Sequence, residues 1–537
     1  MFHQLLTPVS DSLALSFMVA ALPIVAVLFL MGVLRRPAWE ASIAGLVVGL
    51  GLAIEVWKFP AGLALDSAAA GAAFALWPIM WIVFNALVLF NITVSSGRFD
   101  AFHGWVIRHL PNDKRVVLVV IGFCFGALLE GIAGFGTPVA ITSALLIMVG
   151  FEPLEALTYT LIFNTAPVAF GALGAPVTTL AAVTGLPDNV LGAMIGRQLP
   201  VFALLLPFYV IGVYGGVRSL KRLWPALLAA GGSFALTQFL VSNYLGYALT
   251  DVLASLVSLV VTTAFVQVWK PAADPAFVLR HNTAPPAPVT GAARAISPWQ
   301  GWLPWLVVSA VVIGWTLLKI NAIGQLKLPW PGLDKAVFIT LYGKPYAAVW
   351  NFQPLATGTA ILAAAIVTAL LVGCGVKGFA AAAAMAWRQI RLAILTVTVI
   401  VALAYLMNYS GMNYTLGMGV ASVGVIFPLV SVFLGWVAVF LSGSDTSGNA
   451  LFGSLQVVAA RQLGLSPVLF AAANSSGGVM GKMISPQNIS TGVSTTNLKG
   501  QEGKVLAKTF KHSIILTLLL GLLVAAQQHL MAWMIPG

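Results

Sequence analysis

Long apolar runs separated by short polar stretches make up most of this 537-residue chain. The first run, residues 14–34 (ALSFMVAALPIVAVLFLMGVL), is long enough to cross a bilayer as a helix at about 1.5 Å per residue. Runs of this kind predict ordinary spanning helices. They are residues 14–34, 40–57, 69–95, 191–217, 223–242, 247–268, 301–319, 356–376, 391–408 and 511–535.

Basic residues collect between the apolar runs, which is the pattern of cytoplasmic loops in membrane proteins. Arg35 and Arg36 follow the first run, and only His3 precedes it. This order is the reverse of a secretory signal, so we expect the first helix to be retained and both termini to lie outside. The clusters expected in the cytoplasm are Arg35/Arg36, Arg108/Lys114/Arg115, Arg218/Lys221/Arg222, Lys270/Arg280/Arg294, Lys377/Arg388/Arg391 and Lys499/Lys504/Lys508/Lys511.

The composition supports a polytopic membrane protein. The chain is 60% hydrophobic and 8% charged, with a mean hydropathy of +0.97, far from the values of soluble domains. The net charge of +12 is explained by the loop clusters, so no nucleic-acid partner is expected. The two cysteines have no metal-site or disulfide spacing, and no Walker, dinucleotide or HExxH motif occurs. We therefore expect no metal and no cofactor.

Two segments, 116–190 and 412–490, must be threaded so that the basic clusters on either side of each reach the cytoplasm. This holds if 116–150 is a re-entrant hairpin opening from the cytoplasm, with GALLEGIAGFGTPVAIT as its tip, and if 154–187 crosses once. In the second segment, 412–463 is then a hairpin opening from outside with SGSDTSGN as its tip, and 465–490 crosses once. Two such units in opposite orientation are typical of inverted-repeat transporters.

A sequence echo links the two crossings. NTAPVAFGALGAP, Asn164 to Pro176, and NSSGGVMGKMISP, Asn474 to Pro486, place glycine seven and proline twelve residues after the asparagine. Both crossings are predicted to break, near 164–177 and 474–487, and broken helices are tolerated in a membrane only where they are buried in protein or line a wet cavity. The residues expected at hairpin tips and breaks are Gly131, Gly134, Gly136, Pro138, Gly174, Pro176, Gly481 and Pro486.

The predicted fold is an all-α polytopic membrane protein with about 12 spanning helices and two re-entrant hairpins in an inverted repeat. Residues 1–269 form the N-terminal half, 270–300 a Pro- and Ala-rich cytoplasmic linker, and 301–537 the C-terminal half. Residues 320–355 are expected to be an external loop. Hairpin tips and broken-helix ends would meet at one small-ion site near the midplane.

Charged residues inside apolar segments need a partner or a cavity, because a charge at the bilayer centre costs about 2.5–3.5 kcal/mol or more. Asp445 and Lys482 are therefore either a buried structural pair or functional, with Lys482 binding a substrate carboxylate. Glu130 either accepts hydrogen bonds from the glycine amides of its own tip or carries a proton. Arg197, in GRQLP, is either an interfacial arginine or an anion ligand. Glu55 is expected at a span boundary.

Neutral side chains in the same segments are suited to bind a hydroxyl or a carboxylate, although Ser and Thr also join membrane helices. They are Asn164, Thr165, Ser444, Thr446, Ser447, Asn449, Asn474, Ser475 and Ser476. The candidate ligand set is Asn164, Thr165, Ser444, Asn449, Asn474, Ser475, Lys482 and Arg197, with Glu130 and Asp445 as candidate proton carriers.

Several of these stretches resemble the bacterial lactate permease family, which includes glycolate permeases. They are GFCFGALLEGIAGFGTPVAIT (122–142), NTAPVAFGALGAPV (164–177), GRQLP (196–200), GGSFALTQFLVSNYLG (231–246), NYSG (408–411), GSDTSGNALFGSLQ (443–456) and GGVMGKMISPQNI (477–489). The likeness covers most of the chain outside 270–355, and 490–503 departs from it. The hairpin plan is also similar to that of the ion-transporter superfamily that contains dicarboxylate carriers.

The resemblance implies proton symport of L-lactate, D-lactate and glycolate through the bacterial cytoplasmic membrane. Substrate carboxylate would bind Lys482 and freed backbone amides, its hydroxyl would meet Asn or Ser side chains, and Glu130 or Asp445 would take the proton. Three alternatives remain open: Na⁺-coupled carboxylate transport, an anion channel, and a membrane-embedded enzyme, which the scattered histidines do not favour.

Overall fold

The computed structural model describes residues 1–132, 134, 137–270, 274–279, 296–494, 496, 498 and 501–536. Gly136, Arg280, Arg294, Lys499 and most of the expected linker 270–300 lie outside these residues. In the first half the helices are α1 Leu13–Gly32, α2 Ala38–Glu55, α3 Ala61–Phe74, α4 Trp81–Ser95, α5 Arg98–Arg108, α6 Lys114–Val117, α7 Gly126–Ile132, α8 Thr137–Met148, α9 Pro153–Phe163, α10 Gly171–Thr184, α11 Asp188–Leu240 and α12 Thr250–Val268. Short π-helical stretches join α3 to α4 and α6 to α7.

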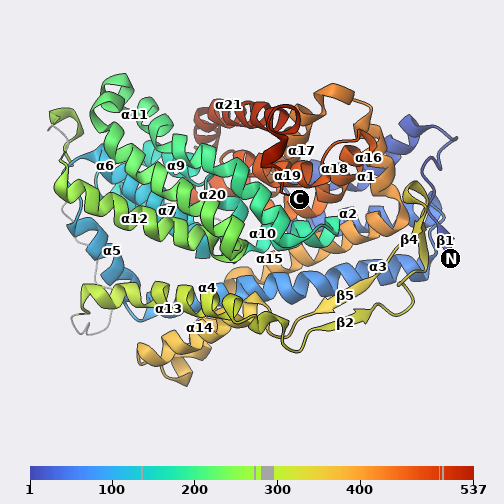
Figure 1. Cartoon of the computed structure of the whole chain (residues 1–537), viewed down its shortest axis with the longest axis horizontal. Coiled ribbons are helices and arrows are strands. Elements are labelled where there is room, and N and C mark those ends of the chain that lie inside the picture. The colour runs from blue at the N-terminus through green and yellow to red at the C-terminus, as the bar shows by residue number, and fades with distance from the viewer. Residues whose placement is uncertain are drawn as a thin grey trace.

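The second half is also mainly helical (Figure 1). Its helices are α13 Pro298–Leu317, α14 Thr357–Leu371, α15 Val376–Ser410, α16 Met412–Ala421, α17 Phe427–Ser442, α18 Asp445–Gln462, α19 Pro467–Lys482, α20 Pro486–Ser494 and α21 Glu502–His529. The long α15 packs against α2, α3 and α4, and α14 also packs on α4. Around the two hairpins, α17, α18 and α19 pack on one another, α18 on α10 and α7 on α12.

The helical membrane fold is confirmed, with ten helices among the described residues long and apolar enough to span, or eleven with the bent pair α9/α10. Twelve spans are not reached by this count, in which Asp188–Leu245 counts once. The runs 191–217 and 223–242 are parts of α11, which bends at Gly216. The expected span 391–408 starts fifteen residues earlier, because the alanine-rich stretch after Val376 is a strong helix former.

The expected span 356–376 is wrong in extent. Its helix, α14, has 15 residues and ends at Leu371, before Gly373 in a left-handed conformation. A helix of that length is shorter than the roughly 20 residues that span a bilayer.

At each expected hairpin one helix ends and the next begins within a few residues. In the first, α7 ends at Ile132 and α8 starts at Thr137. In the second, Gly443 and Ser444 separate α17 from α18. The first expected break is confirmed as a 65° bend between α9 and α10. The second lies at Met483–Ser485, between α19 and α20. Re-entrance, inverted orientation and the division into halves remain predictions.

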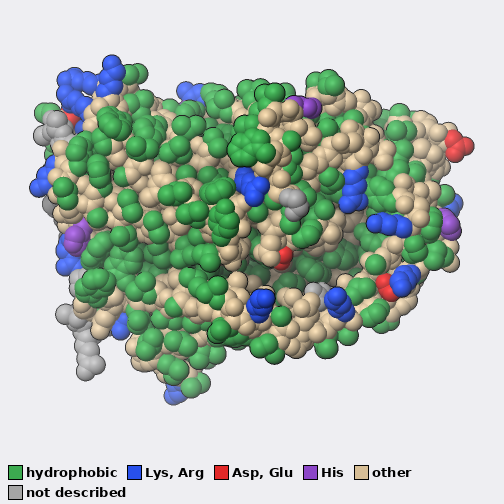
Figure 2. Space-filling view, viewed as in Figure 1, with side chains coloured by type: hydrophobic (Ala, Val, Ile, Leu, Met, Phe, Trp, Pro, Cys, Tyr) green, Lys and Arg blue, Asp and Glu red, His purple; other side chains and the backbone are tan. Residues whose placement is uncertain are grey.

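A group of charged side chains marks the end of the molecule that lies opposite the N-terminus. At this end α6, α11 and the 274–279 segment meet through Arg115, Arg222 and Asp274, with Arg222 2.9 Å and Arg115 3.8 Å from the Asp274 carboxylate. Many Lys and Arg side chains gather at this end (Figure 2). The chain's N-terminus lies at the other end (Figure 1). The Arg115 and Arg222 clusters, both expected on the cytoplasmic face, are therefore neighbours in space.

The expected loop 320–355 is folded into two short sheets, which the sequence did not predict. Strand β2 (Leu326–Pro329) pairs antiparallel with β5 (Val349–Phe352). Strand β3 (Val337–Ile339) pairs parallel with the N-terminal β1 (Phe2–His3) and antiparallel with β4 (Lys344–Pro345). The N-terminus is thus held against this segment, in agreement with the expectation that both lie on one side.

Candidate functional site

A buried ion pair joins the two halves of the chain. Lys482, the last residue of α19, places Nζ 2.6 Å from Oε1 of Glu130 in α7. Asn164, directly after α9, donates to the other carboxylate oxygen at 3.0 Å. Glu130 is 2% exposed and Lys482 4% exposed. The first hairpin tip and the two helix breaks therefore meet at a single carboxylate.

This pairing resolves two alternatives that the sequence left open. Lys482 pairs with Glu130, so a structural Asp445–Lys482 pair is wrong. Within the described part of the chain, the Glu130 carboxylate accepts from Asn164 and Lys482 rather than from the glycines of its tip. A partner 352 residues away in the sequence leaves no local pattern from which it could be read.

Asp445 lies at the start of α18 in a second network, in which its partners are uncharged side chains. Its Oδ2 accepts from the Ser475 hydroxyl at 2.5 Å and from the Asn449 amide at 3.2 Å. Asn449 is also 3.2 Å from the carbonyl oxygen of Pro176 in α10, and Asn474 donates to Asn449 at 3.0 Å. Oδ1 of Asp445 is buried and has no partner among the residues that the structure describes. This network joins the second hairpin to both broken crossings.

A small cavity lies between the ion pair and the Asp445 network. Its volume is about 20 Å³, which is room for about one water molecule. Its walls include the ion pair, the turn Gly443–Thr446 and the break residues Gly171, Ala172 and Pro176. The first turn of α18, capped by Ser444, faces this space, and the positive end of a helix favours an anion. A six-atom carboxylic acid fits only if these walls separate.

Glycines allow the close approach of these walls. A Cβ built on Gly171 would lie 2.9 Å from Oε1 of Glu130, and one on Gly478 would lie 2.5 Å from Oδ1 of Asp445. Either contact is shorter than non-bonded carbon and oxygen atoms tolerate. Both carboxylates are thus positioned against bare backbone.

The Gly478→Ala variant is expected to lower transport by about tenfold or more, since misplacing binding groups by an ångström can cost about 100-fold. Its methyl group would displace the Asp445 carboxylate. Gly232→Ala is a matched control in α11, where the nearest atom to a built Cβ is 3.6 Å away. Initial uptake rates at equal amounts of reconstituted protein measure the effect. Equal rates for the two variants would contradict this role of Gly478.

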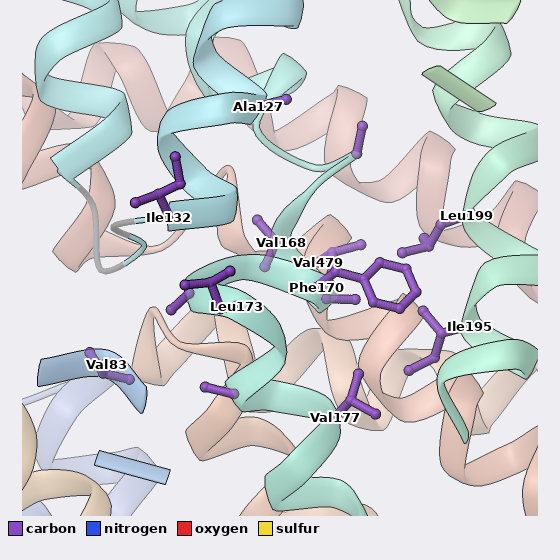
Figure 3. Close-up of a cluster of buried hydrophobic side chains, with 14 of the residues drawn as sticks. Val83, Ala127, Ile132, Val168, Phe170, Leu173, Val177, Ile195, Leu199 and Val479 are labelled. Atoms are coloured by element: carbon purple, nitrogen blue, oxygen red, sulfur yellow. The ribbon is translucent and has the colours of Figure 1, made fainter. Parts of the chain in front are cut away.

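The first break has a strained backbone held by apolar packing. Ala172, Leu173 and Gly174 have φ values of 44°, 54° and 85°, a left-handed conformation that costs about 1–2 kcal/mol for each non-glycine residue. Phe170 points toward Ile195 and Leu199 of α11, as Figure 3 shows. An apolar cluster thus packs against the first break on the side of α11.

Other residues expected at the site lie elsewhere. Thr165 donates to the carbonyl of Ile162 in its own helix turn. Arg197 donates to Asn243 and to the carbonyl of Met534, which favours the alternative of an interfacial arginine. Gly481 belongs to a close contact of α19 with the Trp436 carbonyl of α17, not to a break.

The remaining turn residues have distinct positions. Pro138 and Pro486 lie in the first turns of α8 and α20, where proline is tolerated. Gly134 has a φ of 56° and lines the cavity. Gly174 packs against the Tyr247 ring and Gly131 against Asp251.

Asp251, in α12, is a buried acid near the site that the sequence reading missed. Its side chain is fully buried, and neither carboxylate oxygen has a hydrogen-bond partner among the described residues. A single acid at the start of the apolar run 247–268 was the available signal, since acids inside spans are costly. No group of three His, Cys, Asp or Glu residues suited to a metal occurs among the described residues.

Comparisons with known proteins agree with this plan. The profile of the L-lactate permease family matches residues 16–531. The glycolate permease GlcA of Escherichia coli K12 is 41% identical over 97% of both chains, and the L-lactate permease of Bacillus subtilis 168 is 39% identical over 99% of both. The solved YdaH transporter of Alcanivorax borkumensis covers 94% of this chain and 100% of its own, with a TM-score of 0.51 and 15% identity. That last likeness concerns the fold alone.

Proposed function

This chain belongs to the L-lactate permease family, and we propose that it is a proton symporter of L-lactate, D-lactate and glycolate in the bacterial cytoplasmic membrane. The names of its relatives support L-lactate and glycolate as substrates. The Glu130–Lys482 pair, at 2.6 Å, is the observation that supports proton coupling.

In the proposed mechanism the substrate carboxylate replaces Glu130 at Lys482. An anionic Glu130 left without its lysine in a dry site would be costly, so Glu130 takes a proton as it leaves. Anion and proton then favour each other's binding, which is the coupling free energy that symport needs. One proton accompanies each monocarboxylate, and the charge of the site is the same before and after loading.

The substrate hydroxyl is proposed to bind at the Asp445 network. Oδ1 of Asp445 has no partner, and Ser475 and Asn449 lie around the same carboxylate. A 2-hydroxy acid could therefore span from Lys482 to Asp445 across the cavity that both residues line. Asp445 remains the second candidate for the proton.

A competition series tests whether the protein binds the substrate hydroxyl. L-lactate, D-lactate and glycolate are expected to inhibit uptake of labelled lactate, and acetate to inhibit about 10-fold or more weakly, since an unpaired buried polar group costs about 1–3 kcal/mol. Lactate and glycolate differ by one methyl group and should differ less. Acetate that competes as well as glycolate would contradict a hydroxyl site.

Coupling is tested in proteoliposomes with an imposed pH gradient, alkaline inside, after subtraction of uptake by protein-free liposomes. Lactate is expected to accumulate without Na⁺. Unchanged pH-driven uptake by both Glu130→Gln and Asp445→Asn would contradict the assignment of the proton. Uptake driven only by a Na⁺ gradient would support Na⁺ symport, and a failure to accumulate lactate would support a channel.

A further inference from the structure

Asp251 lies against the hairpin tip that holds Glu130. A Cβ built on Gly131, the residue after Glu130, would lie 2.9 Å from Cβ of Asp251 and 3.2 Å from the amide nitrogen of Val252. Helix α12 packs on α7 and α11. Only a glycine at position 131 permits this contact, so the two acids are held on touching stretches of backbone.

Burial without a counter-ion favours a neutral Asp251. Glu130 and Lys482 are the charged groups near enough to act on it, and Lys482 is already paired with Glu130. An ionised Asp251 would be a fully buried carboxylate with no hydrogen-bond donor and no counter-ion of its own among the described residues. Burying such a charge is unfavourable, and a bound proton removes it.

The side-chain oxygen of the neighbouring Gln238, in α11, also accepts no hydrogen bond from a described residue. The amide nitrogen of Gln238 donates to the carbonyl of Ala166 at 3.1 Å, and its oxygen is buried without a partner in the part of the chain that the structure describes. Gln238 is the polar side chain beside Asp251. A protonated Asp251 can donate a hydrogen bond, and the Gln238 oxygen beside it is an acceptor without a donor. One proton on Asp251 would therefore account for both unpartnered groups.

A large cavity of about 820 Å³ reaches the residues directly before Asp251. Tyr247, Ala248 and Leu249 line it, and Asp188 on its wall accepts a hydrogen bond from the Tyr247 hydroxyl at 3.1 Å. Its walls include α10 and α13, and Figure 2 shows the surface hollowed between these helices. Water in this cavity can approach within one helix turn of Asp251.

We propose that Asp251 is the proton relay of this transporter. It receives a proton from the large cavity and passes it to Glu130 when substrate takes Lys482. In the transfer, the Asp251 acid loses its O–H proton and the Glu130 carboxylate gains it; water in the cavity then reprotonates Asp251. The inference rests on the proposed symport, and it adds the residue through which the proton reaches Glu130.

The test separates exchange from net transport in proteoliposomes. Exchange of labelled for unlabelled lactate at equal concentrations needs no proton transfer, because Glu130 stays protonated throughout. Asp251→Asn is expected to keep exchange near the wild-type rate and to slow pH-driven net uptake by about 100-fold, the usual value of a proton-transfer group. Asp251→Glu is expected to restore net uptake. Asp66→Asn, an acid on α3 away from the site, is the control and should keep both activities.

Infrared difference spectroscopy gives a second readout that a structural role would not change. The carbonyl band of the protonated Asp251 carboxyl is expected at neutral pH in the wild type and in Asp66→Asn. It is expected to be missing from Asp251→Asn. Normal net uptake by Asp251→Asn, equal loss of exchange and net uptake, or an Asp251→Asn protein that fails to fold would each overturn the proposal, since asparagine has the size of the neutral acid. Wild-type protein that shows neither exchange nor pH-driven uptake would instead overturn the proposed function.

Discussion

Replacing Lys482 with methionine is expected to lower lactate uptake by about 30-fold or more, because removing one partner of a buried hydrogen-bonded charge pair costs about 2–5 kcal/mol. Methionine keeps much of the length and the apolar stem but offers no charge to the substrate carboxylate. Both exchange and net uptake should fall together, since the substrate no longer binds. Binding of labelled lactate to the purified protein measures the loss directly.

Lys377→Met is the matched control for this variant. Lys377 is exposed on α15, so its loss should leave uptake within about twofold of the wild type, as is usual for surface changes. Wild-type lactate affinity in Lys482→Met would show that the substrate anion binds elsewhere.

Glu130→Gln is expected to separate substrate binding from the proton. Glutamine mimics the protonated acid, so Lys482 is free for the substrate at any pH. In the pH range where Glu130 is ionised in the empty protein, the affinity of the wild type for lactate should fall about tenfold for each unit by which the pH rises. The affinity of Glu130→Gln should be independent of pH. pH-driven accumulation should be lost and exchange retained.

The same change leaves Lys482 buried without its carboxylate, which costs about 3–5 kcal/mol. The unfolding temperature of Glu130→Gln should therefore be lower than that of the wild type. Lactate should raise it more than it raises that of the wild type, because the bound carboxylate replaces the missing partner. An affinity that keeps the wild-type dependence on pH would place the coupled proton on another residue.

Much of the helical plan could be predicted from the sequence, because lipid imposes strong constraints. Backbone groups cannot remain unpaired in a membrane, so the glycine-rich stretch around Glu130 had to be buried in protein. The basic clusters then restricted the threading, and the boundaries between α7 and α8 and between α17 and α18 lie where this threading expects them. The strands in 326–352 were missed because they are short and lie among turn residues.

The partners within the site could not be predicted. Lys482 meets Glu130 because the second break and the first hairpin tip converge, and no local spacing encodes a contact between residues so far apart. The sequence similarity between the stretches that follow Asn164 and Asn474 predicted equivalent breaks, and this was wrong in part. Asn164 follows the end of α9, whereas Asn474 lies inside α19, which stays helical through Gly477 and Gly481 as they pack on α17.

Asp251 illustrates a different limit. One acid near the start of an apolar run has the sequence pattern of a span boundary, and many such residues reach water. Only the packing of α12 on α7 shows that Asp251 is fully buried and touches Gly131. A buried acid is informative when its surroundings are known, and these depend on tertiary contacts.

Proton uptake on substrate binding is the most direct test of the displacement of Glu130 by substrate. Lactate is added to purified protein in weakly buffered solution, and a pH indicator reports the protons bound. About one proton should be taken up per lactate bound by the wild type, and none by Glu130→Gln. Lactate binding without proton uptake in the wild type, or with equal uptake in Glu130→Gln, would contradict it.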